Sequence, residues 1–483
     1  MEGAAPRSVN YADTLPLAVA STQNRRSFFP QNGQTFTDTG SNIIRIDVNA
    51  DGLLDVQQSY LQFTLRNTEN SIRVLDQGHV WIKRLTIESS GVILEDINNY
   101  NRLVSGILQP AQGSAAYIGE VQLSQGGSQQ SNNFSMIQPA AGVAGALPDT
   151  NFSNRLPAII DNDVTGANAT PDADLTNGTN VLAATGGIAG AGGTFTGQYH
   201  LACGLLNMDK YLPLVLMGQG FTIQLELASG AEIGVMDGAA AAGANTYEIS
   251  AVKYVAHIVD MQRDFYDMLR NLQVASGGSL MIGSSTFRHF THTFTPAAGS
   301  IENINISARV RSLENILFVG NATANLISQD LFGLSTGSTI GMDAGSWNIF
   351  IGSVRYPTNQ VGVNAVSNKG ESYQELRKCF GALGSINHGG LLNCSTYLAT
   401  TDGTDVDGHA AGRGQLPAYG CFGLSFKSWR HELEDGIDTS SRALPCRLEL
   451  TTSAVAVAHT VDIYAQATIL FYINMDGSVS ASV

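Results

Sequence analysis

Apolar residues recur at every second position in many short segments of this chain, and this pattern constrains the fold more than any other feature. Ile44, Ile46 and Val48 alternate with polar residues, and residues 61–65 and 221–227 repeat the pattern. A period of two is the spacing of side chains on one face of a β-strand, so each segment predicts a strand with one buried face. Many short strands bounded by turn residues indicate an all-β chain.

Three segments depart from this period and predict short helices. Residues 97–108 place apolar side chains at steps of three and four, which gives one apolar helical face. Glu95 and Asp96 are then expected in the first turn, where the helix dipole favours acidic side chains. Residues 260–272 and 371–380 show the same helical spacing.

Two stretches, residues 110–198 and 395–419, interrupt the strand pattern and are rich in Gly and small polar residues. A disordered linker is one interpretation of residues 110–198. We favour a long surface insertion, because strands of the same style resume on both sides. Each stretch is preceded by strands and a helix and is followed by further strands, so the same plan occurs twice along the chain.

We therefore predict an all-β fold of two tandem eight-stranded antiparallel jelly-roll β-sandwiches, with a few short helices and long loop insertions. The first jelly roll is expected at residues 41–275, with the insertion at about 110–198. The second is expected at residues 276–483, with the insertion at about 395–419. Residues 1–40 are polar and irregular, and we interpret them as an N-terminal arm.

Charge and cysteine content exclude several functional classes. The chain has 26 Lys and Arg against 41 Asp and Glu, a net charge of -15. A protein that grips DNA needs a basic face, so no direct contact with nucleic acid is expected. No stretch of 18 apolar residues occurs, which predicts no transmembrane segment. The 5 Cys are widely spread without a CxxC pair, which indicates buried thiols rather than disulfides or a zinc site.

One short motif suggests a metal site. Residues 47–52 read Asp-Val-Asn-Ala-Asp-Gly and fit the first six positions of an EF-hand calcium loop. The bidentate Glu of that loop is replaced by Gln58, a neutral amide, and the flanking segments read as strands rather than helices. We favour a β-turn, with a cation site formed by Asp47, Asn49 and Asp51 as the alternative.

Other candidate groups predict no catalytic site and no cofactor. His289 and His292 fall on opposite faces of a strand and are expected to be polar surface residues. Residues 186–193 are Gly-rich, but no Lys-Ser/Thr follows them, so they do not form a phosphate-binding loop. The acidic pairs Asp161/Asp163 and Asp172/Asp174 lie in a polar segment that would not raise a carboxyl pKa, so solvated loop acids are expected. We therefore expect a protein that is not an enzyme.

A series of short segments occurs in a fixed order from residue 59 to about residue 475. They are 59–63 (SYLQF), 91–101 (GVILEDINNYN), 210–214 (KYLPL) followed by 221–227, 308–318, 352–357 (GSVRYP) leading to 372–376 (SYQEL), and 422–441 with Gly-Ile-Asp-Thr at 436–439. The ordered set resembles the double jelly-roll major capsid proteins of double-stranded DNA viruses, the adenovirus, Polinton and virophage lineage. The arm and residues 110–198 have no counterpart in this resemblance.

The resemblance implies a structural role in a virion capsid that assembles inside the host cell. It implies a homotrimer with a pseudo-hexagonal outline that tiles an icosahedral shell and contacts neighbouring capsomers, penton and minor capsid proteins. By the same analogy, residues 110–198 and 395–419 are expected to form the outer tower.

Two other functions remain open at the level of the sequence. A β-sandwich that binds a receptor or glycan, such as a fibre or lectin-like virion protein, would use the same strands but needs exposed aromatic platforms. A hydrolase on a β-scaffold is disfavoured, because no catalytic constellation is found.

Overall fold

The structure of the protein is a computed structural model. It describes residues 21–67, 72–75, 81–108, 111, 159–160, 194–236, 247–295, 297, 299–323, 345–363, 370–380, 397, 420–428, 435–442, 444–452 and 458–483. Most of the predicted insertion at 110–198, and that at 395–419 apart from Tyr397, therefore lie outside the described residues.

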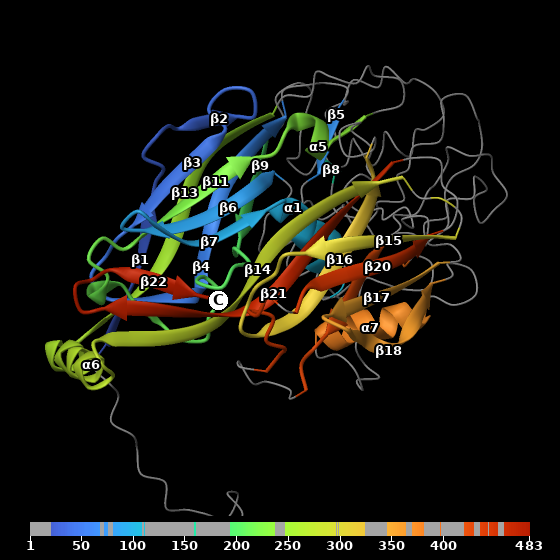
Figure 1. The fold of residues 1–483 in the computed structure, drawn as a ribbon. Coiled ribbons are helices and arrows are strands. Elements are labelled where there is room, and N and C mark those ends of the chain that lie inside the picture. Colours follow the sequence, from blue (N-terminus) through green and yellow to red (C-terminus); the bar gives the residue numbers. More distant parts are fainter. Residues whose placement is uncertain are drawn as a thin grey trace, which may run out of the picture.

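Two facing sheets form a first sandwich in the N-terminal half (Figure 1). One sheet has the order β1-β13-β4-β10, with β2 paired to β13 and β9 paired to β4, and the other has the order β3-β11-β6-β7. A small third sheet has the order β12-β5-β8. The strands are β1 (Ser21–Phe28), β2 (Thr35–Thr37), β3 (Ile43–Val48), β4 (Leu53–Asn67), β5 (Ile72–Leu75), β6 (Ile82–Ser89), β7 (Val92–Asn98), β8 (Ile159–Ile160), β9 (Thr194–Tyr199), β10 (Leu212–Pro213), β11 (Phe221–Leu227), β12 (Gly234–Met236) and β13 (Tyr247–Met261).

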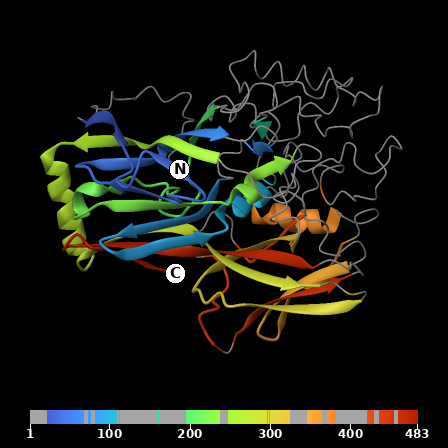
Figure 2. The same ribbon diagram turned by 90° about the horizontal axis from the view of Figure 1, so that it is seen from above.

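The C-terminal half forms a second sandwich beside the first (Figure 2). Its sheets have the orders β14-β21-β16-β19, with β22 paired to β21, and β15-β20-β17-β18. The strands are β14 (Ser279–Phe294), β15 (Ser300–Ile306), β16 (Leu313–Ala322), β17 (Gly345–Ile351), β18 (Val354–Val363), β19 (Cys421–Ser425), β20 (Cys446–Thr452), β21 (His459–Asn474) and β22 (Val479–Ser482).

The two sandwiches have the same topology. In each, eight principal strands taken in chain order place the first, eighth, third and sixth in one sheet, and the second, seventh, fourth and fifth in the other. The principal strands of the first sandwich are β1, β3, β4, β6, β7, β9, β11 and β13, and those of the second are β14 to β21. This order is the double Greek key of a jelly roll. The predicted all-β fold of two tandem jelly rolls is confirmed.

The first jelly roll begins inside the segment that the sequence assigns to an irregular arm. β1 pairs with β13 along its full length, from Ser21 opposite Met261 to Phe28 opposite Tyr254. It is almost wholly polar and exposed, so it carries no alternation of apolar residues that would reveal a strand. Pairing with β13 determines its conformation, and the predicted boundary at residue 41 falls after β1 and β2.

The helices are short and lie mainly at the ends of the sandwiches (Figures 1 and 2). They are α1 (Tyr100–Leu103), α5 (Gly230–Ile233), α6 (Arg263–Ala275) and α7 (Gly370–Cys379), with a π-helical turn at Val104–Leu108 and a 3-10 turn at Leu214–Leu216. The predicted helix at 97–108 begins late, because β7 continues to Asn98 and pairs with β6. Glu95 and Asp96 are therefore strand residues, and placing them in a helical turn was wrong.

Each sandwich core contains a similar trio of aromatic rings, on or directly beside equivalent strands. In the first, Phe63 of β4 meets Trp81 edge-on at 4.9 Å between ring centroids and stacks on Tyr199 at 5.4 Å. The matching rings in the second sandwich are Phe318 of β16, which meets Trp347 edge-on at 5.4 Å and stacks on Phe422 at 5.0 Å. Such pairs contribute about 0.5–1.5 kcal/mol each beyond their burial. The two halves thus repeat a packing arrangement that their sequences do not show.

Candidate functional site: the buried junction between the two sandwiches

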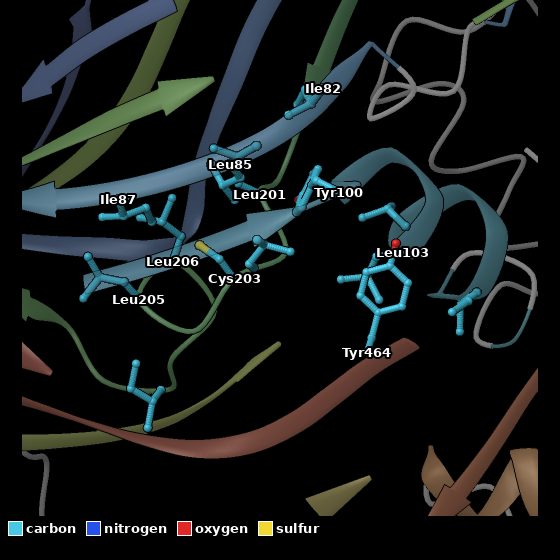
Figure 3. Packing of buried hydrophobic residues seen from close by; sticks show 14 of the residues in the cluster. Ile82, Leu85, Ile87, Tyr100, Leu103, Leu201, Cys203, Leu205, Leu206 and Tyr464 are labelled. Carbon is cyan, nitrogen blue, oxygen red and sulfur yellow. The ribbon is translucent and has the colours of Figure 1, made fainter. Parts of the chain in front are cut away.

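The two sandwiches meet along the long strands of the second one. β14 and β21 are 16 residues each, about 53 Å at 3.3 Å per residue, and they pass beneath the first sandwich before they enter the second (Figure 2). Residues 201–206, which follow β9, lie between the first sandwich and these strands, and Figure 3 shows Cys203, Leu205 and Leu206 in this position. This contact fixes how the two sandwiches are oriented.

Gly204 brings the two backbones together at this contact. A Cβ atom at this position would lie 2.8 Å from Glu95 Oε1 and 3.0 Å from the Ser285 carbonyl oxygen. The Ser284 hydroxyl of β14 donates a hydrogen bond to the Gly204 carbonyl oxygen at 2.7 Å. Glycine is therefore required here by the close approach of a strand from the other sandwich.

Asp462 is the centre of a buried polar cluster at the junction. It belongs to β21, and its side chain is 0% exposed. Oδ2 accepts a hydrogen bond from Arg102 Nη1 at 2.6 Å, and Oδ1 accepts from Asn99 Nδ2 at 2.9 Å. Oδ1 also lies 2.7 Å from Nε2 of His289, on the neighbouring strand β14. Arg102 and Asn99 belong to the first sandwich, so this carboxylate joins the two halves.

The surroundings of Asp462 determine its charge. Burial by itself raises the pKa of a carboxyl group, but hydrogen bonding to His289 and the positive charge of Arg102 outweigh it. The pKa of Asp462 is consequently held well below its usual range. The pKa of Arg102 is raised, since Asp462 and Glu232 more than offset the effect of burial. Both groups are ionised at neutral pH, and the pair is a buried salt bridge.

Further contacts extend this cluster in both directions. Glu232 lies 3.9 Å from Arg102 Nη2 and also forms an ion pair with Lys83 at the start of β6. On the other side, the Tyr464 hydroxyl donates a hydrogen bond to the Asn99 carbonyl oxygen at 2.7 Å. Figure 3 shows this tyrosine reaching from β21 toward Leu103 of α1. The connection therefore includes packed apolar surface as well as charge.

Glu95 forms a second buried polar contact in the same region. Its carboxylate accepts hydrogen bonds from the backbone N–H groups of Gly204 at 2.8 Å and Leu205 at 2.7 Å. Burial raises the pKa of Glu95, although hydrogen bonds from Thr286 of β14 and from these N–H groups act in the opposite direction. Glu95 thus holds the segment between the sandwiches in one conformation.

The residues proposed from the sequence as a cation site lie at the end of β3 and in the turn that follows it. Asp47 is the penultimate residue of β3, and its Oδ1 accepts a hydrogen bond from the Thr222 hydroxyl at 2.7 Å. Asn49 and Asp51 belong to the turn that leads into β4. Within the described part of the chain, no group of three or more His, Cys, Asp and Glu side chains is placed to hold a metal ion. Gly52 in this turn has a φ of +125°, and a cation site formed by Asp47, Asn49 and Asp51 stays a prediction.

The expectation that both histidines are surface residues was wrong for His289. Its side chain is 7% exposed and belongs to the Asp462 cluster. His292 lies on the same strand at 34% exposure, with Nε2 2.9 Å from Oε1 of Glu302. The sequence indicates which residues share a face of β14, but it does not indicate which face is covered. In the structure, Asn99 and Arg102 of the first sandwich cover the side of β14 and β21 that carries His289.

The remaining residues considered from the sequence are the cysteines and several loop residues. Cys203, Cys379, Cys421 and Cys446 are free thiols. Asp161, Asp163, Asp172 and Asp174, together with residues 186–193, lie outside the described residues. Among the described helices, none is long and apolar enough to cross a membrane.

Sequence reasoning missed Asn99, Arg102 and Asp462. One signal was available for Asp462, which stands between Val461 and Ile463 in an otherwise apolar strand segment. A charge at such a position is almost always paired when it is buried. Its partners are more than 170 residues away, at positions 289 and 102, and no local pattern identifies them.

Comparison with known proteins bears on the fold alone. No known sequence family and no curated protein matches the chain. A chain of the PBCV-1 virus capsid is similar, with a TM-score of 0.54 and 9% identity over 98% of this chain and 99% of that one. The chain has the double jelly-roll fold. The Faustovirus major capsid protein gives a TM-score of 0.53 with 9% identity, over 96% of this chain and 92% of the other.

The mavirus major capsid protein is also similar. Its TM-score is 0.50 with 10% identity, and the match covers 100% of this chain and 95% of the other. The similarity therefore spans both sandwiches and the junction between them, rather than one common sandwich module.

Proposed function

We propose that this protein is a major capsid protein, a structural subunit whose homotrimers tile an icosahedral viral shell. The observation that carries the proposal is the extent of the structural similarity. The match with the Faustovirus and mavirus major capsid proteins covers nearly the whole length of both chains. Many proteins contain one jelly roll, and fold by itself does not fix function. A tandem pair that matches from end to end is a much narrower class.

The junction supports this proposal on physical grounds. Two sandwiches from each of three subunits would give six similar blocks around a threefold axis, which is a pseudo-hexagonal outline. Such an outline requires that the two sandwiches of one subunit keep a fixed angle. The buried Arg102–Asp462 pair, the Glu95 contacts and the close approach at Gly204 supply that rigidity. In this proposal the role is structural, and contacts with neighbouring capsomers form the shell.

Light scattering coupled to size-exclusion chromatography tests the proposal on the full chain. A trimer of the 51.1 kDa chain has a mass of about 150 kDa. Electron microscopy of the same fraction should show particles with a hexagonal outline. A stable monomer would contradict the proposal, and a monomer that binds glycans on an array would support the receptor-binding alternative. Contacts with penton and minor capsid proteins stay predictions of the family resemblance.

A further inference from the structure

Five arginines gather at one end of the second sandwich. At this end β15 finishes at Ile306, directly opposite Cys446, the first residue of β20, and β17 turns into β18 at residues 352–353. Residues 307–312 and 435–442 form the loops beside this turn. The arginines of this surface, which we call the basic end, are Arg309, Arg311, Arg355, Arg442 and Arg447.

Most of these guanidinium groups face solvent. Arg309 and Arg311 are exposed, and each follows a buried apolar residue, so the two side chains point outward together. Arg355 and Arg442 are exposed as well, and the Arg447 side chain is 41% exposed. Four fully exposed arginines and one half-buried arginine therefore lie on one surface.

An aromatic ring orders two of these side chains. Phe350 of β17 lies directly opposite both Arg355 of β18 and Arg447 of β20. The guanidinium carbons of Arg355 and Arg447 lie 5.5 and 4.4 Å from the centre of its ring. A guanidinium above a ring is attracted to its π-electrons and still has N–H groups to donate. The ring thus holds both side chains without cancelling their charge.

Hydrogen bonds join the loops of the basic end to one another. The Thr439 N–H donates to the Val310 carbonyl oxygen at 2.9 Å, and the Thr439 hydroxyl donates to the Ala308 carbonyl oxygen at 2.9 Å. The Gly352 N–H donates to the Pro445 carbonyl oxygen, also at 2.9 Å. The loops therefore form one fixed surface, and little backbone ordering is needed before it binds a partner.

Few acidic side chains balance this charge. The described parts of the loops contain two, Asp435, which is buried, and Asp438, which is exposed. Hydrogen bonds from Ser440 and the charge of Arg311 hold the pKa of Asp438 below its usual range, so it is ionised at neutral pH. One exposed carboxylate accompanies four exposed guanidinium groups, and this end is positive although the whole chain carries a net charge of -15.

The chemistry of the basic end fits the repeated phosphates of a nucleic acid. Guanidinium groups bind phosphate oxygens through two N–H groups at a time. Arginines spread over several loops match a charged backbone, which offers many phosphates in a row. A membrane surface also offers phosphates, but stable attachment takes an apolar face or a lipid chain besides basic residues. The described residues here expose only two large apolar side chains, Val354 and Leu444.

We propose that the basic end binds the phosphate backbone of a nucleic acid, independently of its base sequence. Contacts to phosphates fix position and carry no direct sequence information. The net charge of the chain predicts no such contact, but binding depends on the charge of the surface that meets the ligand. This inference does not depend on the proposed capsid function.

Fluorescence anisotropy of a short labelled DNA duplex, titrated with the full chain at several salt concentrations, tests the proposal. Each phosphate contact adds about -0.9 to the slope of log K against log salt concentration. If the four exposed arginines each contact one phosphate, the slope is about -3.6, and binding weakens about 150-fold between 50 and 200 mM salt. Duplexes of different base composition should bind alike.

The variant R309Q/R311Q removes two of the contacts. We expect its slope to fall to about -1.8 and its affinity at low salt to fall at least tenfold. Both side chains are exposed, so urea unfolding should show an unaltered fold. The matched control is R263Q/R270Q, which removes two exposed arginines of α6 that alternate with Asp264 and Asp267. Its slope and affinity should equal those of the unaltered protein.

Absence of DNA binding at low salt, or an equal loss in the two variants, would overturn the proposal. Sedimentation with phosphatidylserine vesicles separates the two sources of phosphate. Binding to vesicles without binding to DNA would overturn the assignment to nucleic acid and would assign the basic end to lipid headgroups. A monomer in light scattering that still binds DNA would contradict the proposed capsid function and would support this inference.

Discussion

Asn in place of Asp462 removes the charge at the centre of the junction and changes little else. The carboxylate accepts hydrogen bonds from Arg102 at 2.6 Å and Asn99 at 2.9 Å, and it lies 2.7 Å from His289. The variant D462N leaves Arg102, which is 6% exposed, as a buried charge whose nearest remaining carboxylate is Glu232 at 3.9 Å. Breaking one partner of a buried ion pair costs about 3–5 kcal/mol.

Urea unfolding measures this loss. Trp81 and Trp347 lie in the cores of the first and second sandwich, so tryptophan fluorescence reports on both. We expect the free energy of unfolding to fall by about 3–5 kcal/mol in D462N. The control is D267N, since Asp267 is 56% exposed and lies 4.0 Å from Arg263. Surface pairs of this kind contribute about 0–1 kcal/mol.

A loss in D462N no larger than that in the control would refute the idea that this cluster fixes the two sandwiches. A double variant, R102M/D462L, sharpens the measurement. Replacing a buried pair with apolar side chains of similar size is often close to neutral. We therefore expect the double variant to lose less stability than the sum of the two single variants, and a simple sum would show that the two groups are not coupled.

Three further predictions concern particular residues. First, the difference in free energy of unfolding between D462N and the unaltered protein should shrink below about pH 4. The pKa of Asp462 is depressed in the fold, so its carboxylate stabilises the fold above the unfolded-state pKa, and this stabilisation is lost as the pH falls further. A difference that stays constant with pH in urea titrations would contradict the prediction. Second, the free energy of unfolding of G220A should fall by about 2 kcal/mol or more in urea unfolding, because Gly220 has a φ of +64° and a Cβ atom there would overlap a carbonyl oxygen of β3. In the control G277A the added Cβ atom meets no neighbour, and the fall should be about 1 kcal/mol. Third, the free energy of unfolding of T439V should fall by about 1–3 kcal/mol in urea unfolding, because the buried Thr439 hydroxyl donates a hydrogen bond to the Ala308 carbonyl oxygen at 2.9 Å. The control T439S keeps the hydroxyl and should retain most of that stability.

Alternation predicted the strands wherever one face of a strand is buried and the other is not. β11 shows this plainly, since every second residue from Phe221 to Leu227 is buried. The same criterion fails for β1, because both of its faces are exposed and its sequence carries no period. It fails also for Glu95, where a helical spacing nearby is overridden by pairing between β6 and β7. Periodicity reports burial, and it identifies a strand only where burial alternates.

The junction could not be predicted from local patterns for a different reason. Asp462 stands out locally as a charge between apolar residues, but its partners Arg102 and His289 do not, and the contact among them depends on where three distant elements meet. The same holds for the aromatic trios. Trp81 and Trp347 have no common sequence context, yet each meets a phenylalanine of the third strand of its sandwich edge-on. Equivalence of position becomes visible only when the strands are ordered in sheets.

The sequence by itself determined the class of fold, because a period of two over many short segments cannot be satisfied by helices. It also determined that the plan occurs twice, since strands, a helix and a long polar stretch recur in order. The tertiary structure decided where the first sandwich begins and how the two sandwiches are joined. Both depend on hydrogen bonds and ion pairs between residues far apart in the chain, which leave no period in the sequence.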